Sequence, residues 1–278
     1  MTTNNILKLA AFSDGDQGGN PAGVWIGDTL PDGANMQRIA AEVGFSETAF
    51  AVPIEGGWRV RYFSPQTEIP FCGHATIALG AALAGLNGDG LFNLTLNQAQ
   101  ISVEGHARGG LISATLQSPP THSEAIAPEL LDEGLALFGY DRSDLDERIP
   151  PASINGGAQH LVLVLNSRKK LKDMQYDQQA GRELMVRAGW VTILLAWCET
   201  GQLFHTRNPF AYGGVYEDPA TGAATAAFAG YLRDIGWPHN GLIDIVQGED
   251  MGSRSRLRAE IPEQKGSSIR VSGMARKL

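Results

Sequence analysis

The chain is poor in cysteine, in basic residues and in long apolar runs. Two cysteines, Cys72 and Cys198, occur in 278 residues, too few for a disulfide framework, which indicates a reducing compartment. Lys and Arg number 22 against 30 Asp and Glu, a net charge of -8, so we expect neither a nucleic-acid nor a membrane partner. No apolar run approaches the roughly 18 residues that cross a bilayer, and the N-terminal segment lacks the basic and apolar regions of a signal peptide. These absences predict a cytoplasmic protein.

Short strands account for most of the regular structure that the sequence predicts, because runs of apolar and β-branched residues alternate with Gly and Pro turns. Strands are expected over residues 5–12, 23–28, 48–55, 58–64, 91–96, 99–105, 110–117, 158–165, 190–199, 202–207, 242–248, 256–261 and 269–275. We further expect a hairpin turn over 105–110, a short amphipathic helix over 36–44 and a linker around 119–130.

One phrase occurs twice in the chain. EIPFCGHAT at 68–76 returns as EDPATGAAT at 217–225, with Glu, Pro, Gly, Ala and Thr in the same places. Residues 72–86 and 221–232 contain no Asp, Glu, Lys or Arg. A helix that is apolar on all sides must be enclosed on all sides, and its small residues let strands pass close to its axis. Each half of the chain is therefore expected to be a sheet curled around a central helix.

Both copies place a glycine, Gly73 or Gly222, at the start of the expected helix. A helix N-terminus presents unpaired backbone N–H groups and a partial positive charge, which favour an anion. If both helix starts face one cleft between the halves, the cleft would suit a small carboxylate-bearing molecule held chiefly by backbone N–H groups. The alternative is that the repeat records a duplicated fold and nothing more.

Five motifs carry a resemblance to a known family. They are GGNPAGV at 18–24, MQRIAAEVGFSETAF at 36–50, FSPQTEIPFCGHAT at 63–76, GGVYEDPATGAA at 213–224 and QGEDMG at 247–252. Together they resemble the phenazine-biosynthesis PhzF-like isomerases, which have the diaminopimelate-epimerase-like fold. The resemblance implies an α+β protein of two pseudo-symmetric domains, each a mostly antiparallel sheet rolled around a central apolar helix. It also implies an active site between the domains, and a homodimer.

The domain boundary is expected near the middle of the chain. We place the N-terminal domain at 1–118 and the C-terminal domain at 119–266. A last strand at 267–278 is expected to complete the N-terminal domain.

The resemblance also implies roles for individual residues. Glu47 of SETAF matches the family's catalytic acid/base, and His74 of GHAT and Asp218 of EDPATG match residues of the same pocket. The expected substrate-binding neighbours are Ser46, Gly73, Gly222 and Ala223. In the best-studied members the base moves a proton between carbons of a dihydro-hydroxyanthranilate, without a metal or an organic cofactor. Such chemistry needs one group that accepts and returns a proton in a dry site.

The expected function is therefore a cofactor-independent isomerase of a small carboxylate-bearing substrate, with Glu47 as the single acid/base. A non-catalytic binder of a similar acid is the alternative from another class. Each residue also has a purely structural alternative. Glu47 could be an exposed loop carboxylate, Asp218 a helix N-cap before Pro219, and His74 a core histidine. The other histidines lack ligand spacing, so no metal site is expected.

Cys72 offers a third mechanism, because it stands where diaminopimelate-epimerase relatives keep one of two catalytic cysteines. A thiol at a helix N-terminus ionises readily. The repeat places Thr221 at the opposite position, and a hydroxyl is far too weak an acid to replace a second thiol. The sequence thus favours a single-carboxylate isomerase over a Cys72-dependent epimerase or racemase. Ala223 stands where many members have Ser, which leaves the identity of the substrate open.

Overall fold

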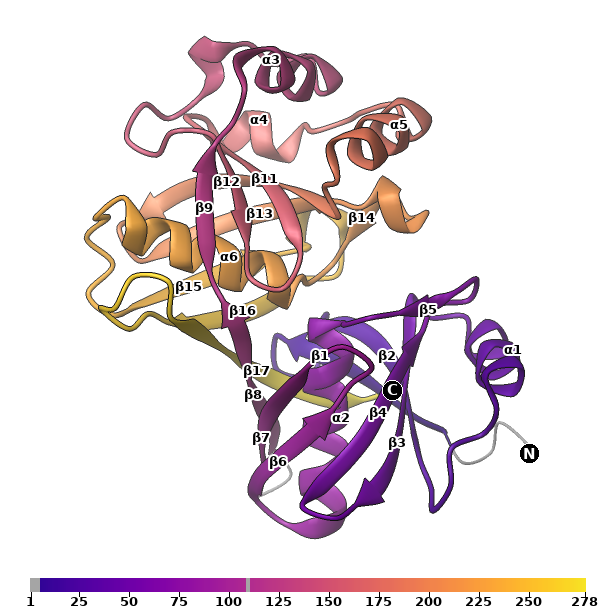
Figure 1. Cartoon of the computed structure of the whole chain (residues 1–278). Coiled ribbons are helices and arrows are strands. Elements are labelled where there is room, and N and C mark those ends of the chain that lie inside the picture. The colour runs from indigo at the N-terminus through magenta and orange to yellow at the C-terminus, as the bar shows by residue number, and fades with distance from the viewer. Residues whose placement is uncertain (1–5, 109–110) are drawn as a thin grey trace. The chain divides into compact units, whose positions relative to one another are not determined.

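The computed structural model describes residues 6–108 and 111–278, which divide into two compact units (Figure 1). Unit 1 takes its residues from 1–117 and 272–278, and unit 2 consists of 118–271. The strands are β1 (Ile6–Ser13), β2 (Asn20–Ile26), β3 (Glu47–Ile54), β4 (Gly57–Phe63), β5 (Glu68–Ile69), β6 (Gly90–Thr95), β7 (Gln100–Arg108), β8 (Leu111–Pro120), β9 (His122–Ala125), β10 (Ala152–Asn155), β11 (Gln159–Leu165), β12 (Thr192–Thr200), β13 (Leu203–Pro209), β14 (Glu217–Asp218), β15 (Leu242–Gln247), β16 (Ser255–Glu260) and β17 (Ser268–Lys277). The α-helices are α1 (Gly33–Val43), α2 (Gly73–Asn87), α3 (Pro128–Leu137), α4 (Arg168–Lys172), α5 (Gln178–Ala188) and α6 (Gly222–Asp234), and short 3₁₀ helices are η2 (Arg142–Asp144), η3 (Ala211–Gly213) and η4 (Glu249–Met251).

Unit 1 is a closed ring of strands around α2. The pairings run from β1 through β2, β3, β4, β6, β7 and β8 to β17, and β17 pairs back with β1. The helix packs against β1, β2, β3, β6 and β7, and every residue from Gly73 to Ala84 is buried. The uncharged sequence of α2 follows from this enclosure, since an unpaired charge on any side would be buried.

Two glycines allow the helix and a strand of the ring to touch. A Cβ added at Gly105 of β7 would lie 2.3 Å from the carbonyl oxygen of Gly80 in α2. A Cβ added at Gly80 would lie 2.4 Å from Cγ2 of Val103. The small residues of the apolar helix therefore permit the close passage of strands that the sequence predicts.

The amphipathic helix expected over 36–44 is α1, which packs against β3 and β4. Asp32 caps its first turn through the N–H of Asn35, and Gly44 ends it in a left-handed conformation, φ 73°. Its buried residues Met36 and Ile39 join a cluster with Phe50 of β3. The glycine turn then leads the chain directly into β3, which begins with Glu47.

Unit 2 builds a similar enclosure around α6. Strands pair in the order β9, β10, β11, β12, β13, β15 and β16. Helix α6 packs against β9, β10, β11, β15 and β16, and all its residues from Ala224 to Arg233 are buried. A Cβ at Gly230 would lie 2.4 Å from Oγ1 of Thr121, so a small residue again permits a close approach.

Three further helices, which the sequence reasoning did not identify, cover the other face of this sheet. Leu161, Leu163 and Leu165 alternate along β11 and pack with buried residues of α3, α4 and α5. Such alternation in a sheet covered on both faces gives a continuous apolar run, here LVLVL. The segment 119–130, expected to be a linker, begins beside the boundary between the units at 117/118, but it is not irregular, because His122–Ala125 form β9, paired with β10, and α3 begins at Pro128.

The two units repeat one order of strand pairing. In unit 1, β2 runs parallel to β3, β3 antiparallel to β4, β4 parallel to β6 and β6 antiparallel to β7. In unit 2, the same succession joins β11, β12, β13, β15 and β16. A two-residue strand, β5 or β14, precedes each central helix and pairs with β4 or β13. The pseudo-symmetric α+β architecture expected from the sequence is thus confirmed.

Two other expectations concern local features. The hairpin expected around 105–110 is formed by β7 and β8, but residues 105–108 belong to β7, which pairs Arg108 with Leu111; residues 109–110 lie outside the described residues. None of the helices in the described part of the chain is long and apolar enough to cross a membrane.

Candidate active site

Glu47 is the first residue of β3 and is buried, with 4% of its surface exposed. It pairs in register with Ala22 of β2, which runs parallel to β3. The hypothesis that Glu47 is an exposed loop carboxylate is therefore wrong. A buried carboxylate outside an arginine or lysine pair is uncommon, because desolvation penalises its charged form.

His74, the second residue of α2, faces Glu47. Its Nε2 atom lies 3.3 Å from Oε2 of Glu47 and 3.4 Å from Oγ of Ser46. Oε2 of Glu47 has no hydrogen-bond partner among the described residues, despite this proximity. The start of β3 and the start of α2 thus bring together Ser46, Glu47, Gly73 and His74, all within unit 1.

Cys72 also lies against the imidazole of His74. It is the N-cap residue of α2, with extended backbone angles and no side-chain capping bond, and its Sγ atom lies 3.4 Å from Nδ1 of His74. Oγ1 of Thr76 donates to the Cys72 carbonyl oxygen at 2.7 Å and lies 2.7 Å from the buried Tyr62 hydroxyl. Burial raises the pKa of Tyr62, so this hydroxyl stays protonated and helps to hold the loop.

Asp218 belongs to β14 in unit 2 and is also buried, with 5% of its surface exposed. Its Oδ2 atom accepts a hydrogen bond of 2.6 Å from Oγ1 of Thr221. Thr221, and not Asp218, is the N-cap residue of α6, so the capping hypothesis for Asp218 is wrong. Gly222 is buried at the helix start and Ala223 is partly exposed in the first turn.

Gln247 contacts both Asp218 and Thr221, although the sequence analysis gave it no role. It ends β15 and is fully buried. Its Nε2 atom donates to the Asp218 carbonyl oxygen at 2.6 Å, and its Oε1 atom accepts from the N–H of Thr221 at 3.1 Å. The signal was present, since Gln247 follows the strand-like residues 242–246 and opens the motif QGEDMG. Gln247 fixes the segment that carries Asp218 against the start of α6.

The family model of phenazine biosynthesis-like proteins, PhzC-PhzF, matches residues 9–277. The chain belongs to this family. It is 31% identical over 297 residues to an uncharacterised isomerase of Mesorhizobium japonicum, with 100% of this chain and 98% of that protein covered. It is 31% identical over 281 residues to the trans-2,3-dihydro-3-hydroxyanthranilate isomerase of Pseudomonas aeruginosa, covering 97% of this chain and 95% of that one.

A solved structure from Bacillus anthracis, a phenazine biosynthesis protein of the PhzF family, has the same fold. Its TM-score is 0.85 at 21% identity, over 98% of this chain and 96% of that chain. The protein is an isomerase of the PhzF type.

An arginine–glutamate pair recurs in this PhzF-type chain directly before each central helix. Arg61 of β4 donates through Nε and Nη2 to both carboxylate oxygens of Glu68 in β5, at 2.7 and 2.6 Å. Arg207 of β13 makes the same two bonds to Glu217 of β14, at 2.9 and 2.5 Å. In each repeat the arginine stands two residues before the strand partner of the glutamate, Phe63 or Pro209. The sequence repeat therefore includes a bidentate clamp on the segment that leads into the helix.

The two clamps differ in burial. The side chains of Arg207 and Glu217 are 9% and 2% exposed, whereas those of Arg61 and Glu68 are 25% and 28% exposed. The Arg61 guanidinium holds the pKa of Glu68 below its ordinary value. Arg207 also donates through Nη1 to the backbone carbonyl oxygens of Leu171, Lys172 and Met174. Both pairs have the geometry of structural supports.

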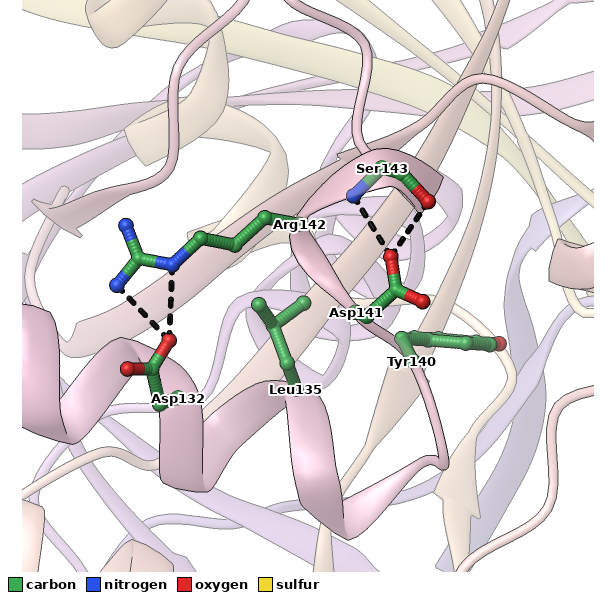
Figure 2. A pocket seen from close by; sticks show the side chains of 6 residues that line it. All are labelled: Asp132, Leu135, Tyr140, Asp141, Arg142 and Ser143. Atoms are coloured by element: carbon green, nitrogen blue, oxygen red, sulfur yellow. Dashed lines mark hydrogen bonds and ion pairs between the residues drawn. The ribbon is translucent and has the colours of Figure 1, made fainter.

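Figure 2 shows a pocket of unit 2 that is separate from all residues predicted for the site; it is lined by Asp132, Leu135, Tyr140, Asp141, Arg142 and Ser143. Arg142 pairs with Asp132, and Asp141 accepts hydrogen bonds from Ser143 (Figure 2). The charged groups of this pocket are therefore engaged with neighbouring side chains.

Proposed function

We propose that this PhzF-type isomerase moves a proton between carbons of a small carboxylate-bearing substrate, with Glu47 as its single acid/base and without a cofactor. The observation that carries the proposal is the buried Glu47 carboxylate, whose Oε2 atom lies 3.3 Å from the His74 ring and has no hydrogen-bond partner among the described residues. A carboxylate held beside the reacting carbon can accept a proton from it and return that proton to another carbon.

His74 and Ser46 are proposed to position Glu47 and to contact the substrate. Nε2 of His74 lies 3.3 Å from Oε2 of Glu47 and 3.4 Å from Oγ of Ser46. The ring is held in the first turn of α2, where the residues are buried. A rigid helix places the ring more precisely than a loop would. The expectation of a purely structural core histidine has less support, because a core histidine does not need a carboxylate beside it.

The substrate carboxylate is proposed to bind at the start of α2, where Gly73 lets a ligand approach the backbone closely. Neither Cys72 nor Thr221 caps its helix with a side chain, so backbone N–H groups of the first turns have no such side-chain acceptor. By the resemblance and the sequence repeat, we propose that Asp218, Gly222 and Ala223 serve in substrate binding. Asp218→Asn is expected to weaken substrate binding, and unchanged binding would contradict this part of the proposal.

The substrate class is proposed to be a cyclic or amino-acid-like carboxylic acid. One relative is named for trans-2,3-dihydro-3-hydroxyanthranilate, a ring carboxylate whose isomerisation is a proton transfer between carbons. Ala223 has no hydroxyl, so a substrate that needs a side-chain donor at that position would bind less tightly here.

The experiment that tests the proposal is a screen for exchange of carbon-bound hydrogen in D2O. The purified protein is incubated with small cyclic and amino acids, and deuterium incorporation is followed by NMR or mass spectrometry. Enzyme-dependent exchange, without added metal or cofactor, supports the proposal. Compounds that bind with a measurable affinity yet never exchange would support the alternative of a non-catalytic binder.

A Cys72-dependent epimerase is a second candidate, favoured by the 3.4 Å separation between Sγ of Cys72 and Nδ1 of His74. An imidazole beside a thiol can accept its proton and activate it. Against this candidate, the repeat places the hydroxyl of Thr221 at the corresponding helix start, and that hydroxyl donates to Asp218. Inversion of a stereocentre by the wild type, abolished in Cys72→Ser, would establish the second candidate in place of the first.

The oligomeric state is proposed to be a homodimer, as the family resemblance implies. Light scattering coupled to gel filtration tests it, since the chain alone has a mass of 29.7 kDa. A monomer at micromolar concentration would contradict the proposal.

A further inference from the structure

Glu47, Cys72 and His74 each offer a ligand atom, and these atoms all lie within 4.8 Å of one another. We propose that this cluster binds a thiophilic divalent cation such as Zn²⁺, and that the bound cation inhibits the enzyme. Binding follows from the three side chains alone. Inhibition rests on the proposed function, because it requires Glu47 to be the catalytic base.

The separations fit a tetrahedral zinc ion. With Zn–N and Zn–O bonds near 2.1 Å and a Zn–S bond near 2.3 Å, ligand atoms lie about 3.3 to 3.8 Å apart. Nε2 of His74 lies 3.3 Å from Oε2 of Glu47 and 4.0 Å from Sγ of Cys72. The carboxylate oxygen of Glu47 and Sγ of Cys72 lie within 4.8 Å of each other, so rotation of the cysteine side chain would bring Sγ to the spacing of a tetrahedral site. Three protein ligands leave a fourth position for water or a substrate oxygen.

The state of the Glu47 carboxylate is an independent indication of a ligand. Its Oε2 atom is buried and has no hydrogen-bond partner among the described residues, and leaving such an atom unsatisfied is unfavourable. His74 is the ion-pair partner of Glu47, and no Lys or Arg in the described part of the chain pairs with it. A divalent cation would satisfy the oxygen and compensate the charge.

The donor set selects the kind of cation. Thiolate and imidazole suit zinc and similar ions, whereas magnesium and calcium prefer oxygen ligands. Cys72 would bind as the thiolate and release its proton to solvent, and His74 would bind as the neutral imidazole. We therefore expect zinc, cobalt and cadmium to bind and magnesium and calcium to have no effect.

The binding test uses Co²⁺ as a spectroscopic probe of the full chain. Wild-type protein titrated with Co²⁺ is expected to show a thiolate-to-cobalt charge-transfer band, which zinc then displaces. Cys72→Ser should lose the band and bind zinc roughly 10-fold or more weakly. Cys198→Ser is the matched control, because Cys198 is the only other cysteine, and it should keep both the band and the affinity. Glu47→Gln should also weaken zinc binding, which guards against a misfolded serine variant.

The activity test separates this inference from the proposed function. Zinc is expected to inhibit exchange by the wild type, and substrate should protect against it. A band that is absent in the wild type, or that survives in Cys72→Ser, would overturn the metal site whatever the activity. A band with full activity of the zinc-loaded protein would leave the site standing and would contradict both its inhibitory role and Glu47 as the base.

Discussion

Nε2 of His74 lies 3.3 Å from Oε2 of Glu47, although the two residues come from the start of a helix and the start of a strand. The fold makes this contact because α2 is enclosed by the strands of unit 1, including β3. Both side chains are buried. In such a dry environment, neighbouring groups influence the proton affinity of an acid or base more strongly than they do in water.

Cys72→Ser is expected to keep most of the isomerase activity. In the single-carboxylate mechanism the thiol only contacts His74, and serine occupies a similar volume at the N-cap position, where it is well tolerated. Steady-state kinetics on a substrate from the exchange screen measures the effect. A loss of several orders of magnitude with the fold intact would instead establish the thiol mechanism.

Gly105→Ala is expected to destabilise the protein by about 1 to 3 kcal/mol, because overpacking forces elements apart. Its Cβ would lie 2.3 Å from the carbonyl oxygen of Gly80. Gly85→Ala is the matched control in α2: a Cβ there meets nothing within 4 Å, and alanine should stabilise a helix by roughly 0.5 to 1 kcal/mol. Urea unfolding of both variants checks the opposite signs, and equal shifts would contradict the close contact of α2 with β7.

Arg207→Ala is expected to destabilise the protein by about 3 to 5 kcal/mol, because it leaves the buried Glu217 carboxylate unpaired. Its counterpart in the repeat, Arg61→Ala, removes the same bidentate bonds from a pair that is about a quarter exposed, and should cost about 1 kcal/mol or less. Thermal unfolding compares the two. If both variants lost the same stability, burial would not explain how much each arginine–glutamate pair contributes.

Stability is expected to rise with pH between about 3 and about 6.5 through His160. Burial lowers the pKa of this histidine to about 3, whereas in the unfolded chain it is about 6.5. Between these values the unfolded state binds one more proton than the folded state, so stability falls as pH falls, by up to about 1.4 kcal/mol per pH unit. His160→Gln should remove this part of the slope in unfolding measured across that range. An unchanged slope would contradict it.

Much of the fold could be predicted from the sequence. Each segment expected to be a strand from its apolar pattern overlaps a strand of the structure, and the two uncharged segments are the enclosed helices α2 and α6. These predictions succeed because an element buried on every side has little compositional freedom. Helices α3 and α5 were missed, since each buries only three residues and has no uncharged run like those of α2 and α6.

The site could be predicted only in part. The SETAF and GHAT motifs identified Glu47 and His74, which the structure brings together. Asp218 before Pro219 has the sequence of an N-cap, yet β13 pairs with β14 and delays the helix to Gly222. The role of Gln247 depends on contacts with Asp218 and Thr221 that arise only when β15 lies beside β13. Pairing between distant strands leaves little trace in a local pattern.

Glu47→Gln tests the central claim most directly, because it keeps the shape of the side chain and removes the proton acceptor. The measurement is deuterium incorporation from D2O at the substrate carbon, with Glu55→Gln, an exposed glutamate in the turn after β3, as the control. We predict that exchange by Glu47→Gln falls by at least about 10²-fold, with little change in thermal stability, while Glu55→Gln exchanges at the wild-type rate. Exchange by Glu47→Gln at the wild-type rate would contradict the account.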